Sequence, residues 1–396
     1  MKKFTERMQG VLPPEELPAF FRALDELGTR PRKSIRLRRD LAPERAEYWT
    51  PARFAELGIP LGERVPWYEH GYFFDLARMT PHPSRHPVIA AGLGFIQEAG
   101  AMEVVPELEV RADHLVLDLC AAPGAKSTHL GEYLGPGGWL VANEPDRERA
   151  RLLDAILARH GIGNSTVYNL DPRRLADRFP GVFDRILVDA PCSGESLFAK
   201  RVEKRKDVSH KDVERCALRQ RAILSNAWEM LAPGGRLVYS TCAYSRTENE
   251  EVVGGFREEN SEGALVREGR RFPHRDGVPG GYFAVLERAG EGEPTRAERG
   301  MRLRTSVSSG GTSGLIRDGR VRWNGEIDRY VVAMDRRSGG ASPSEGGVVE
   351  LDFASVERFL AGEKLHAEGS VLYLWEGEPF ASASGGTIHY PRGRLR

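Results

Sequence analysis

Two of the four cysteines stand where a thiol could act as a nucleophile. Cys192 lies in Asp189-Ala-Pro-Cys-Ser-Gly194 and Cys242 ends Ser240-Thr-Cys242, and each segment directly follows a short apolar run. If these runs are neighbouring parallel strands, about 5 Å apart, both thiols face one cleft. A free cysteine is more often a small buried hydrophobic residue. Cys216 lies inside an amphipathic helical pattern, and we interpret it in this way. The cysteines form no Cys-x-x-Cys pair, so neither a zinc ribbon nor a disulfide framework is expected.

Acids after other apolar runs could bind a nucleotide-like ligand. The segment Asp118-Leu-Cys-Ala-Ala-Pro-Gly-Ala-Lys-Ser127 follows a run and opens a helical pattern, which is where an open α/β sheet binds such ligands. It has neither the Gly-x-Gly-x-x-Gly nor the P-loop pattern, so neither a dinucleotide nor a triphosphate is expected. Glu144 ends the next run, where an acid can accept hydrogen bonds from both hydroxyls of a ribose. Asp171 follows a third strand segment, although before Pro172 it could instead cap a helix.

The spacing of these runs predicts the elements that must position the candidate residues. Short apolar runs at 115–119, 139–143, 183–188 and 236–240 alternate with helical patterns near 126–134, 146–159 and 212–231. Strands separated by helices indicate β-α-β units and therefore a doubly wound α/β sheet. A later run at 281–288 follows closely on a turn and predicts an antiparallel strand at the edge of that sheet.

At these motifs the chain resembles the RNA 5-methylcytosine methyltransferase family, the Sun-domain proteins. The matching segments are Leu117-Asp-Leu-Cys-Ala-Ala-Pro-Gly124, Asp189-Ala-Pro-Cys-Ser-Gly-Glu195, Ser240-Thr-Cys242, Glu248-Asn-Glu250, Phe95-Ile-Gln-Glu98 and Tyr390-Pro-Arg-Gly-Arg-Leu-Arg396. The chain departs from the family at Ala125, where glycine is usual and where alanine requires a negative φ, and at Arg38, where asparagine is common. Its tail at 380–384 lacks the usual tryptophan, glycine and lysine.

The resemblance implies a Rossmann-like class I methyltransferase domain with S-adenosylmethionine as the cofactor. It also implies RNA as the substrate, with 16S rRNA or the 30S subunit expected and tRNA as the alternative. The residues expected at the cofactor are Asp118, Cys120, Ala121, Ala122, Pro123, Gly124, Lys126, Glu144, Asp171 and Asp189. By its position in the turn alone, Cys120 is a small packing residue.

The chemistry of cytosine methylation requires a thiol. Carbon 5 of cytosine is a weak nucleophile, so a thiolate must first add to carbon 6 and later be expelled. Chemistry alone leaves open which cysteine attacks, because DNA cytosine methyltransferases use a cysteine in a Pro-Cys context. The resemblance implies that Cys242 attacks and that Cys192 assists release. Asp189, at a strand end, could bond N3 and the amine of cytosine, and Lys126 is implied to reach into the site, unless it is a surface lysine.

The length of the chain, 396 residues, and the changes of residue pattern along it predict three domains. Residues 1–80 combine a helical pattern, the basic stretch Arg30–Arg39 and nearby aromatics, and we expect a small RNA-binding α/β domain there. The catalytic domain is expected at 81–290. A small β-rich RNA-binding domain of PUA or RRM type is expected at 291–396, with strands at 330–334 and 371–375.

Composition sets further expectations. Lys plus Arg and Asp plus Glu number 57 each, so net charge does not indicate a nucleic-acid partner, although the basic run Lys200–Lys206 could contact phosphate. With no apolar run of membrane-span length, we expect a cytoplasmic monomer that binds neither membrane nor metal. The paired cysteines disfavour two alternatives, a non-catalytic RNA-binding ribosome-assembly factor and a DNA cytosine methyltransferase.

Overall fold

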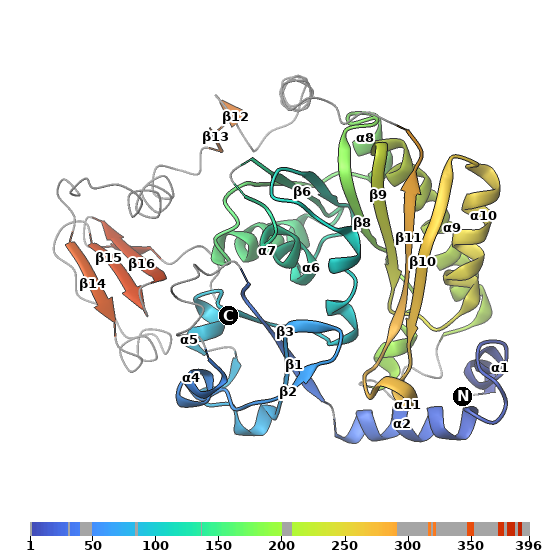
Figure 1. Cartoon of the computed structure of the whole chain (residues 1–396), viewed down its shortest axis with the longest axis horizontal. Helices are drawn as coiled ribbons and strands as arrows, with labels where there is room; N and C mark the ends of the chain where they lie inside the picture. Colours follow the sequence, from blue (N-terminus) through green and yellow to red (C-terminus); the bar gives the residue numbers. More distant parts are fainter. Residues whose placement is uncertain are drawn as a thin grey trace.

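A seven-stranded sheet forms the centre of the molecule (Figure 1). The structure is a computed structural model, and it describes residues 2–30, 32–39, 50–83, 86–135, 137–199 and 208–290 and short strands between 316 and 389. The strands of the central sheet, in spatial order, are β10 (Gly263–Arg271), β11 (Gly281–Arg288), β9 (Leu231–Thr241), β8 (Phe183–Asp189), β5 (Leu115–Asp118), β6 (Trp139–Asn143) and β7 (Ser165–Tyr168). From β9 to β7 the strands are parallel, which confirms the predicted doubly wound α/β sheet.

The antiparallel end of the sheet differs from the prediction in one respect. β11 pairs antiparallel with β9, as expected, but it is not the edge, because β10 pairs with its other side. β10 escaped notice in the sequence because its side chains are mostly exposed or half-buried, so no apolar alternation marks it.

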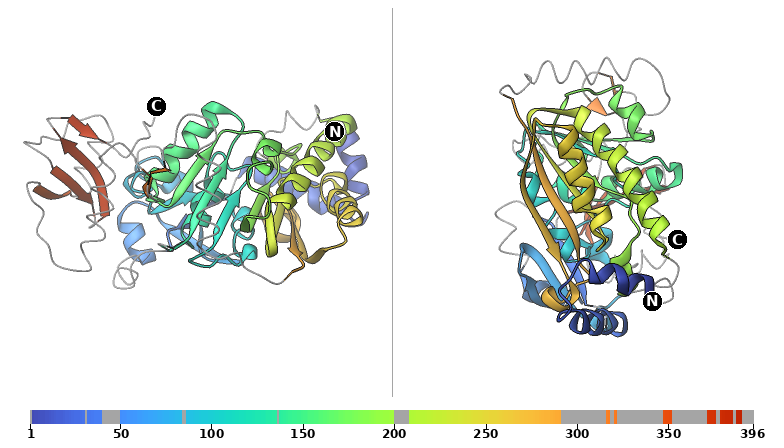
Figure 2. Two further views of the ribbon diagram at one scale, coloured as in Figure 1. Left: turned by 90° about the horizontal axis from the view of Figure 1, so that it is seen from above. Right: turned by 90° about the vertical axis from the view of Figure 1, so that its right-hand side faces the viewer.

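Helices cover both faces of the sheet, as Figure 2 shows. Successive residues of β5 illustrate the arrangement: Val116 packs in a cluster with α6 (Ala125–Gly131) and α7 (Arg147–Arg159), whereas Leu117 packs with the opposite helices. Those opposite helices are α8 (Pro172–Ala176), α9 (His210–Met230) and α10 (Glu250–Glu259). Burial on both faces explains why the parallel strands appear in the sequence as continuous apolar runs.

A second, four-stranded antiparallel sheet precedes the central one in the chain. Its order is β2 (Leu61–Val65), β3 (Tyr68–Phe74), β1 (Lys33–Leu37) and β4 (Gly94–Ile96), so it includes residues on both sides of position 80. The helices of this region are α1 (Lys2–Gln9), α2 (Leu17–Thr29), α4 (Pro51–Glu56) and α5 (Pro87–Ala90). The division of the chain into domains stays a prediction.

The basic stretch at 30–39 is central to this small sheet rather than an exposed edge. β1 lies between β3 and β4, and the Arg36 side chain is 1% exposed. Its Nη1 atom lies 2.9 Å from Glu132 Oε1, and its Nη2 donates to Thr128 Oγ1 at 2.8 Å. Arg36 therefore connects the small sheet to α6 and to the residue at the C-terminal end of this helix. Arg36 thus has a structural role, although it belongs to a basic stretch that we expected to face RNA.

Two helices at the start of the chain pack against the central domain. Phe4 of α1 and Phe20 of α2 share a buried cluster with Phe198, Tyr244 and Phe272. The Phe4 and Phe198 rings are 5.1 Å apart, and the Phe20 and Tyr244 rings are 5.2 Å apart. Figure 1 shows both helices lying at one end of the central sheet, beside α11 (Pro273–Asp276).

The remaining elements are short. Described 3-10 helices are η1 (Leu76–Arg78), η3 (Gly100–Met102), η4 (Pro106–Leu108), η5 (Glu195–Ala199) and η7 (Arg246–Glu248). The C-terminal strands are β12 (Ile316–Arg317), β13 (Arg320–Val321), β14 (Gly347–Leu351), β15 (Val371–Trp375), β16 (Glu378–Ser384) and β17 (Thr387–His389). β15 confirms the strand expected at 371–375. The strand expected at 330–334, the basic run at 200–206 and the terminal segment 390–396 lie outside the described residues.

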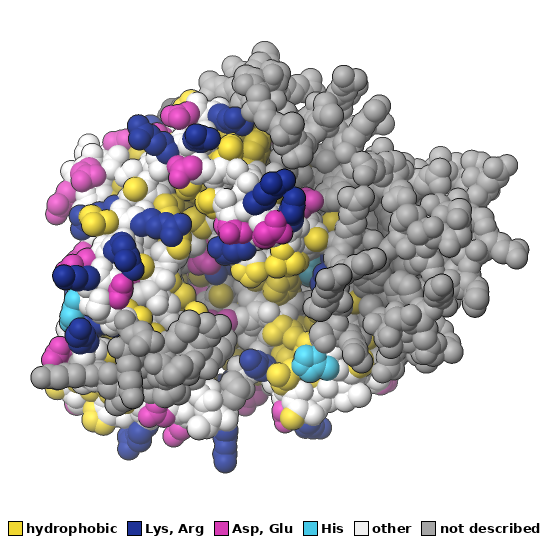
Figure 3. Space-filling model, turned by 180° about the vertical axis from the view of Figure 1, so that it is seen from behind, with side chains coloured by type: hydrophobic (Ala, Val, Ile, Leu, Met, Phe, Trp, Pro, Cys, Tyr) yellow, Lys and Arg dark blue, Asp and Glu magenta, His cyan; other side chains and the backbone are white. Residues whose placement is uncertain are grey.

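Charge on the visible surface is mixed. Figure 3 shows lysine and arginine side chains interleaved with aspartate and glutamate over the described part of one face. This pattern agrees with the formal net charge of zero. No helix in the described ranges is both long enough and apolar enough to cross a membrane.

Candidate active site

The carboxyl ends of β8 and β9 bring the two cysteine segments together. The register pairs Asp189 with Ser240, and the Ser240 hydroxyl donates to Asp189 Oδ1 at 2.8 Å. Beyond the strands, the Sγ atoms of Cys192 and Cys242 lie 3.0 Å apart. The two thiols that the sequence placed at neighbouring strand ends therefore touch in the structure.

The surroundings of the two thiols differ in charge. The hydrogen bond from Cys192, the positive charge of Lys126 and a hydrogen bond from Ser196 hold the pKa of Cys242 below its ordinary value. The pKa of Cys192 lies well above its ordinary value because of its contact with Cys242, its burial and the nearby Glu248 carboxylate. Of the two thiols, Cys242 is therefore the easier to ionise.

Lys126 points into the site and not into solvent. It is the second residue of α6, and its Nζ lies 2.7 Å from Asp189 Oδ2. Because Ser240 occupies the other oxygen, the Asp189 carboxylate is held at both of its atoms. The pKa of Lys126 is raised by this ion pair in spite of burial, so the ammonium keeps its charge beside the thiols.

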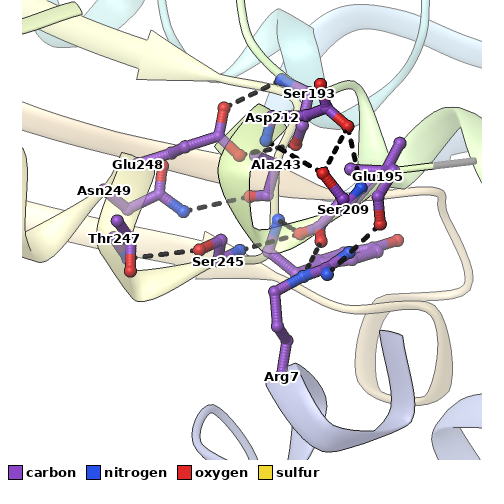
Figure 4. Close-up of polar contacts among 12 residues, drawn as sticks. Arg7, Ser193, Glu195, Ser209, Asp212, Ala243, Ser245, Thr247, Glu248 and Asn249 are labelled. Atoms are coloured by element: carbon purple, nitrogen blue, oxygen red, sulfur yellow. Dashed lines mark hydrogen bonds and ion pairs between the residues drawn. The ribbon is translucent and has the colours of Figure 1, made fainter. Parts of the chain in front are cut away.

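A buried glutamate connects the segment after Cys192 to the segment after Cys242. Glu195 Oε2 accepts from the main-chain N–H groups of Tyr244, at 3.0 Å, and Ser245, at 2.9 Å. Its Oε1 accepts from Arg7 Nε at 2.8 Å, and Figure 4 shows Arg7 extending from α1 to this contact.

A second buried glutamate makes the reverse connection. Glu248, at the end of η7, accepts from the Ser193 main-chain N–H at 2.8 Å and from Gln220 Nε2 at 3.0 Å. Its neighbour Asn249 accepts from Thr241 Oγ1 at 2.6 Å and donates to the Ala243 carbonyl at 3.0 Å. Both loops that carry the cysteines are thus held by buried side chains (Figure 4).

The turn after β5 has the shape expected of a ligand-binding turn. Gly124 has φ of 112°, a conformation that favours glycine, and an added Cβ would lie 3.0 Å from Ile156 Cγ2. Ala125, which replaces the usual glycine of the family, is not among the residues with positive φ, so alanine is tolerated. Asp118 is fully buried and accepts from Ser127 Oγ at 2.7 Å, while its Oδ1 has no hydrogen-bond partner among the described residues.

The acids at the next strand ends have different surroundings. Glu144 is buried after β6, where Oε1 accepts from the Asp146 N–H at 2.9 Å and Oε2 lies 3.2 Å from Arg149 Nη1. Each carboxylate oxygen retains a lone pair for a ribose hydroxyl. Asp171 is exposed and accepts from the Arg173 N–H at 2.9 Å, so it caps α8, the alternative considered from the sequence. Its cofactor contact stays a prediction.

Several residues of the site carried no assigned role in the sequence. Glu195 and Glu248 lie inside segments that match the Sun-domain proteins, and this position in the sequence could have identified them as site residues. Arg149 also donates from Nη2 to the Ala122 carbonyl at 2.8 Å, which joins Glu144 to the glycine turn. Arg7 had no sequence signal, because it lies far from every motif. Within the described residues, no group of three or more His, Cys, Asp or Glu side chains could hold a metal ion.

Comparison with known proteins identifies this domain. Residues 105–278 match the family described as 16S rRNA methyltransferase RsmB/F. This part of the chain is therefore similar to the RsmB/F family. The chain is 36% identical over 206 residues to ribosomal RNA small subunit methyltransferase F of Erwinia tasmaniensis, covering 51% of this chain and 43% of that one. It is 37% identical over 253 residues to the Vibrio cholerae serotype O1 protein of the same name, covering 63% and 52%. The chain thus spans about half the length of these curated relatives.

Solved structures share the fold of this chain. The crystal structure of PH0851 is 26% identical, with a TM-score of 0.63, and the match covers 72% of this chain and 65% of that one. NSun6 from Pyrococcus horikoshii, solved with SFG, has the same fold at 21% identity, with a TM-score of 0.63 and coverage of 74% and 99%. Family and fold are those of S-adenosylmethionine-dependent methyltransferases, in agreement with the expected cofactor.

Proposed function

We propose that this protein methylates carbon 5 of cytosine in RNA, with 16S rRNA as the substrate and S-adenosylmethionine as the methyl donor. The observation that carries the proposal is the contact between Cys192 and Cys242, whose Sγ atoms lie 3.0 Å apart beside the charged Lys126–Asp189 pair. Methyl transfer to an amine or hydroxyl needs no thiol, whereas attack on carbon 6 of a pyrimidine does. The match to the RsmB/F family and the names of the relatives support rRNA as the target.

The residues of the glycine turn fit a bound cofactor. Asp118, with its unpartnered buried oxygen, and the small residues Ala121, Ala122, Pro123 and Gly124 would form the floor of the site. Glu144 would accept from the ribose hydroxyls. The cofactor supplies an electrophilic methyl group on sulfur. Cys120, packed beneath the turn, contributes shape to the site.

The two thiols divide the work of addition and release. The Cys242 thiolate adds to carbon 6 and raises the electron density at carbon 5, which then takes the methyl group. The proton on carbon 5 must afterwards leave to a base, and the carbon 6–sulfur bond breaks to return the Cys242 thiolate. Cys192, whose Sγ lies 3.0 Å from that of Cys242, would assist this release by donating a hydrogen bond to the departing sulfur, while another base or water takes the carbon 5 proton.

Asp189 and Lys126 would recognise the base and balance its charge. The Asp189 carboxyl group, held by Ser240 and Lys126, can accept from the exocyclic amine of cytosine, a donor that uracil lacks. Negative charge that develops on the ring during attack at carbon 6 is stabilised by the nearby ammonium of Lys126.

The flanking segments keep their proposed role in RNA binding. At the N-terminal end the described structure adds a qualification, because α1, α2 and β1 pack tightly against the catalytic domain. Deleting residues 1–80 would remove buried contacts along with any RNA-binding surface. Charge-reversal variants of exposed residues are therefore the better test of RNA binding in this region.

The full-length protein provides a direct test of the function. The protein is incubated with S-adenosylmethionine and one of three substrates: 16S rRNA, 30S subunits or tRNA. The RNA of each substrate carries tritium at carbon 5 of its cytosines, and the tritium released is measured. We expect release from 16S rRNA or 30S subunits, and bisulfite sequencing should locate the modified cytidine. Methyl incorporation without tritium release would overturn carbon 5 as the target, and release from tRNA alone would overturn the proposed substrate.

A further inference from the structure

The first helix of the chain reaches the loops that carry the two cysteines. Arg7 of α1 is 6% exposed at its side chain, and Glu195, which it contacts, is fully buried. Glu195 lies three residues beyond Cys192, so the ion pair joins α1 to the Pro-Cys loop. Phe4, one turn earlier on α1, packs its ring 5.1 Å from that of Phe198 in η5, the same segment.

Glu195 also determines where the other cysteine loop lies. Its second oxygen accepts from the N–H groups of Tyr244 and Ser245, the second and third residues after Cys242. The Ser196 N–H donates to the Cys242 carbonyl at 3.0 Å, which is a further link between the loops. One carboxylate therefore bridges both thiol-bearing segments, and its remaining oxygen is held only by α1 among the contacts of the described residues.

Glu248 connects the same loops in the opposite direction. It belongs to the segment after Cys242 and binds Ser193, the residue next to Cys192. The two glutamates thus form a reciprocal clamp, in which each loop supplies a carboxylate that receives N–H groups of the other. Among the described residues of the site, only the Glu195 half of this clamp forms an ion pair, with Arg7.

We propose that Arg7 is a positioning residue for the catalytic thiols: by holding Glu195, it keeps the Cys192 and Cys242 loops in register. This inference rests on the proposed function, because it assumes that the contact between the thiols matters for catalysis. It also assigns α1 to the catalytic apparatus, whereas the sequence placed residues 1–80 in an RNA-binding domain. The charge on Arg7 is required because an unpaired carboxylate is costly to keep buried.

Loss of Arg7 should change the positions of the thiols more than it changes the binding of RNA or cofactor. Without its basic partner, the Glu195 carboxylate would turn toward water, and its bonds to Tyr244 and Ser245 would weaken. The loops would separate, and Cys242 would lose the hydrogen bond from Cys192. That hydrogen bond is the largest cause of the lowered pKa of Cys242. Displacement of a catalytic group by about 1 Å can cost roughly 100-fold in rate.

The test compares Arg7→Met with Arg7→Lys and with a matched control. Arg22→Met removes the same charge from an exposed position on α2, so it reports any general effect of charge on RNA binding. Glu195→Gln and the double variant Arg7→Met/Glu195→Gln complete a cycle. Four quantities are measured on the full-length proteins: kcat, KM for RNA, cofactor affinity, and the pH dependence of Cys242 alkylation followed by peptide mass spectrometry.

We expect kcat to fall by about 100-fold in Arg7→Met, with KM and cofactor affinity within about twofold of the wild type and partial rescue in Arg7→Lys. The alkylation midpoint of Cys242 should move to higher pH in Arg7→Met and stay unchanged in Arg22→Met. The double variant should be no slower than the worse single variant, because both changes remove the same interaction, the Arg7–Glu195 ion pair.

Wild-type kcat with an unchanged alkylation profile in Arg7→Met would overturn the inference. Equal loss of kcat, RNA affinity and cofactor affinity, together with a lowered melting temperature in Arg7→Met and Arg7→Lys alike, would also overturn it by showing a purely structural role. The alkylation measurement needs no RNA. An inactive wild-type protein would therefore count against the proposed function and not against the clamp.

Discussion

The Sγ atoms of Cys192 and Cys242 lie 3.0 Å apart, although the two residues come from different strand ends of the central sheet. This contact makes the two thiols separable by experiment, because one is placed to attack and the other to assist release. Cys192→Ala should still form a bond to RNA and then stall, whereas Cys242→Ala should form none. A denaturing gel with substrate RNA and cofactor should show a slow, protease-sensitive band for Cys192→Ala only. The reverse pattern would assign the attack to Cys192.

Lys126 should control the reactivity of Cys242. Its positive charge lowers the pKa of that thiol, so Lys126→Met should raise this pKa and move the midpoint of Cys242 alkylation to higher pH. Less thiolate would then be present at neutral pH, and alkylation would be slower. Lys211→Met, which removes an exposed lysine of α9, is the control. The same midpoint of Cys242 alkylation in the wild type, Lys126→Met and Lys211→Met would show that Lys126 does not act on the thiol.

Glu144 should carry much of the cofactor affinity. If it accepts from the ribose hydroxyls, Glu144→Ala should weaken binding by about 1.5–3 kcal/mol per hydrogen bond lost, or roughly 10- to 100-fold in Kd. Isothermal calorimetry measures the change. Glu148→Ala, at a position 77% exposed on α7, should leave Kd unchanged. Equal Kd values for the wild type and Glu144→Ala would remove Glu144 from the cofactor site.

Asp118 should make stability depend on pH. Burial raises its pKa in the folded protein to about 7. Between about pH 4 and pH 7 the unfolded chain loses this proton while the folded protein keeps it, so stability falls as pH rises through that window. Asp118→Asn cannot ionise and should lack this fall. Its Tm relative to wild type, measured without cofactor, should therefore be higher at pH 8 than at pH 4.5, and an equal difference at both pH values would contradict the prediction.

Two arginines of the basic stretch should differ in their effect on stability. Arg36 and Glu132 are both buried, so Arg36→Met breaks a buried ion pair by removing one partner and should cost about 3–5 kcal/mol. Arg32 pairs with Glu63 at the surface, and Arg32→Met should cost less than about 1 kcal/mol. Urea denaturation of the two variants measures the difference. Equal losses would show that the Arg36–Glu132 pair does not anchor β1 to α6.

The periodicity of the sequence predicted the central sheet well because its strands are buried on both faces. Continuous apolar runs at 115–119, 139–143 and 183–188 became β5, β6 and β8, and the amphipathic patterns between them became helices. β10 left no such trace, since an edge strand with exposed side chains needs no apolar pattern.

The sequence by itself determined which chemical groups stand at the ends of the parallel strands: Cys192, Cys242, Asp189, and the acids Asp118 and Glu144. In a parallel α/β sheet the chain order of β-α-β units brings all carboxyl ends to one edge, so local patterns were sufficient. Only the tertiary structure decided that Arg36 is buried against Glu132 and that Arg7 holds Glu195. Both pairs join residues far apart in the chain, and their partners are chosen by packing between elements, which no local pattern encodes.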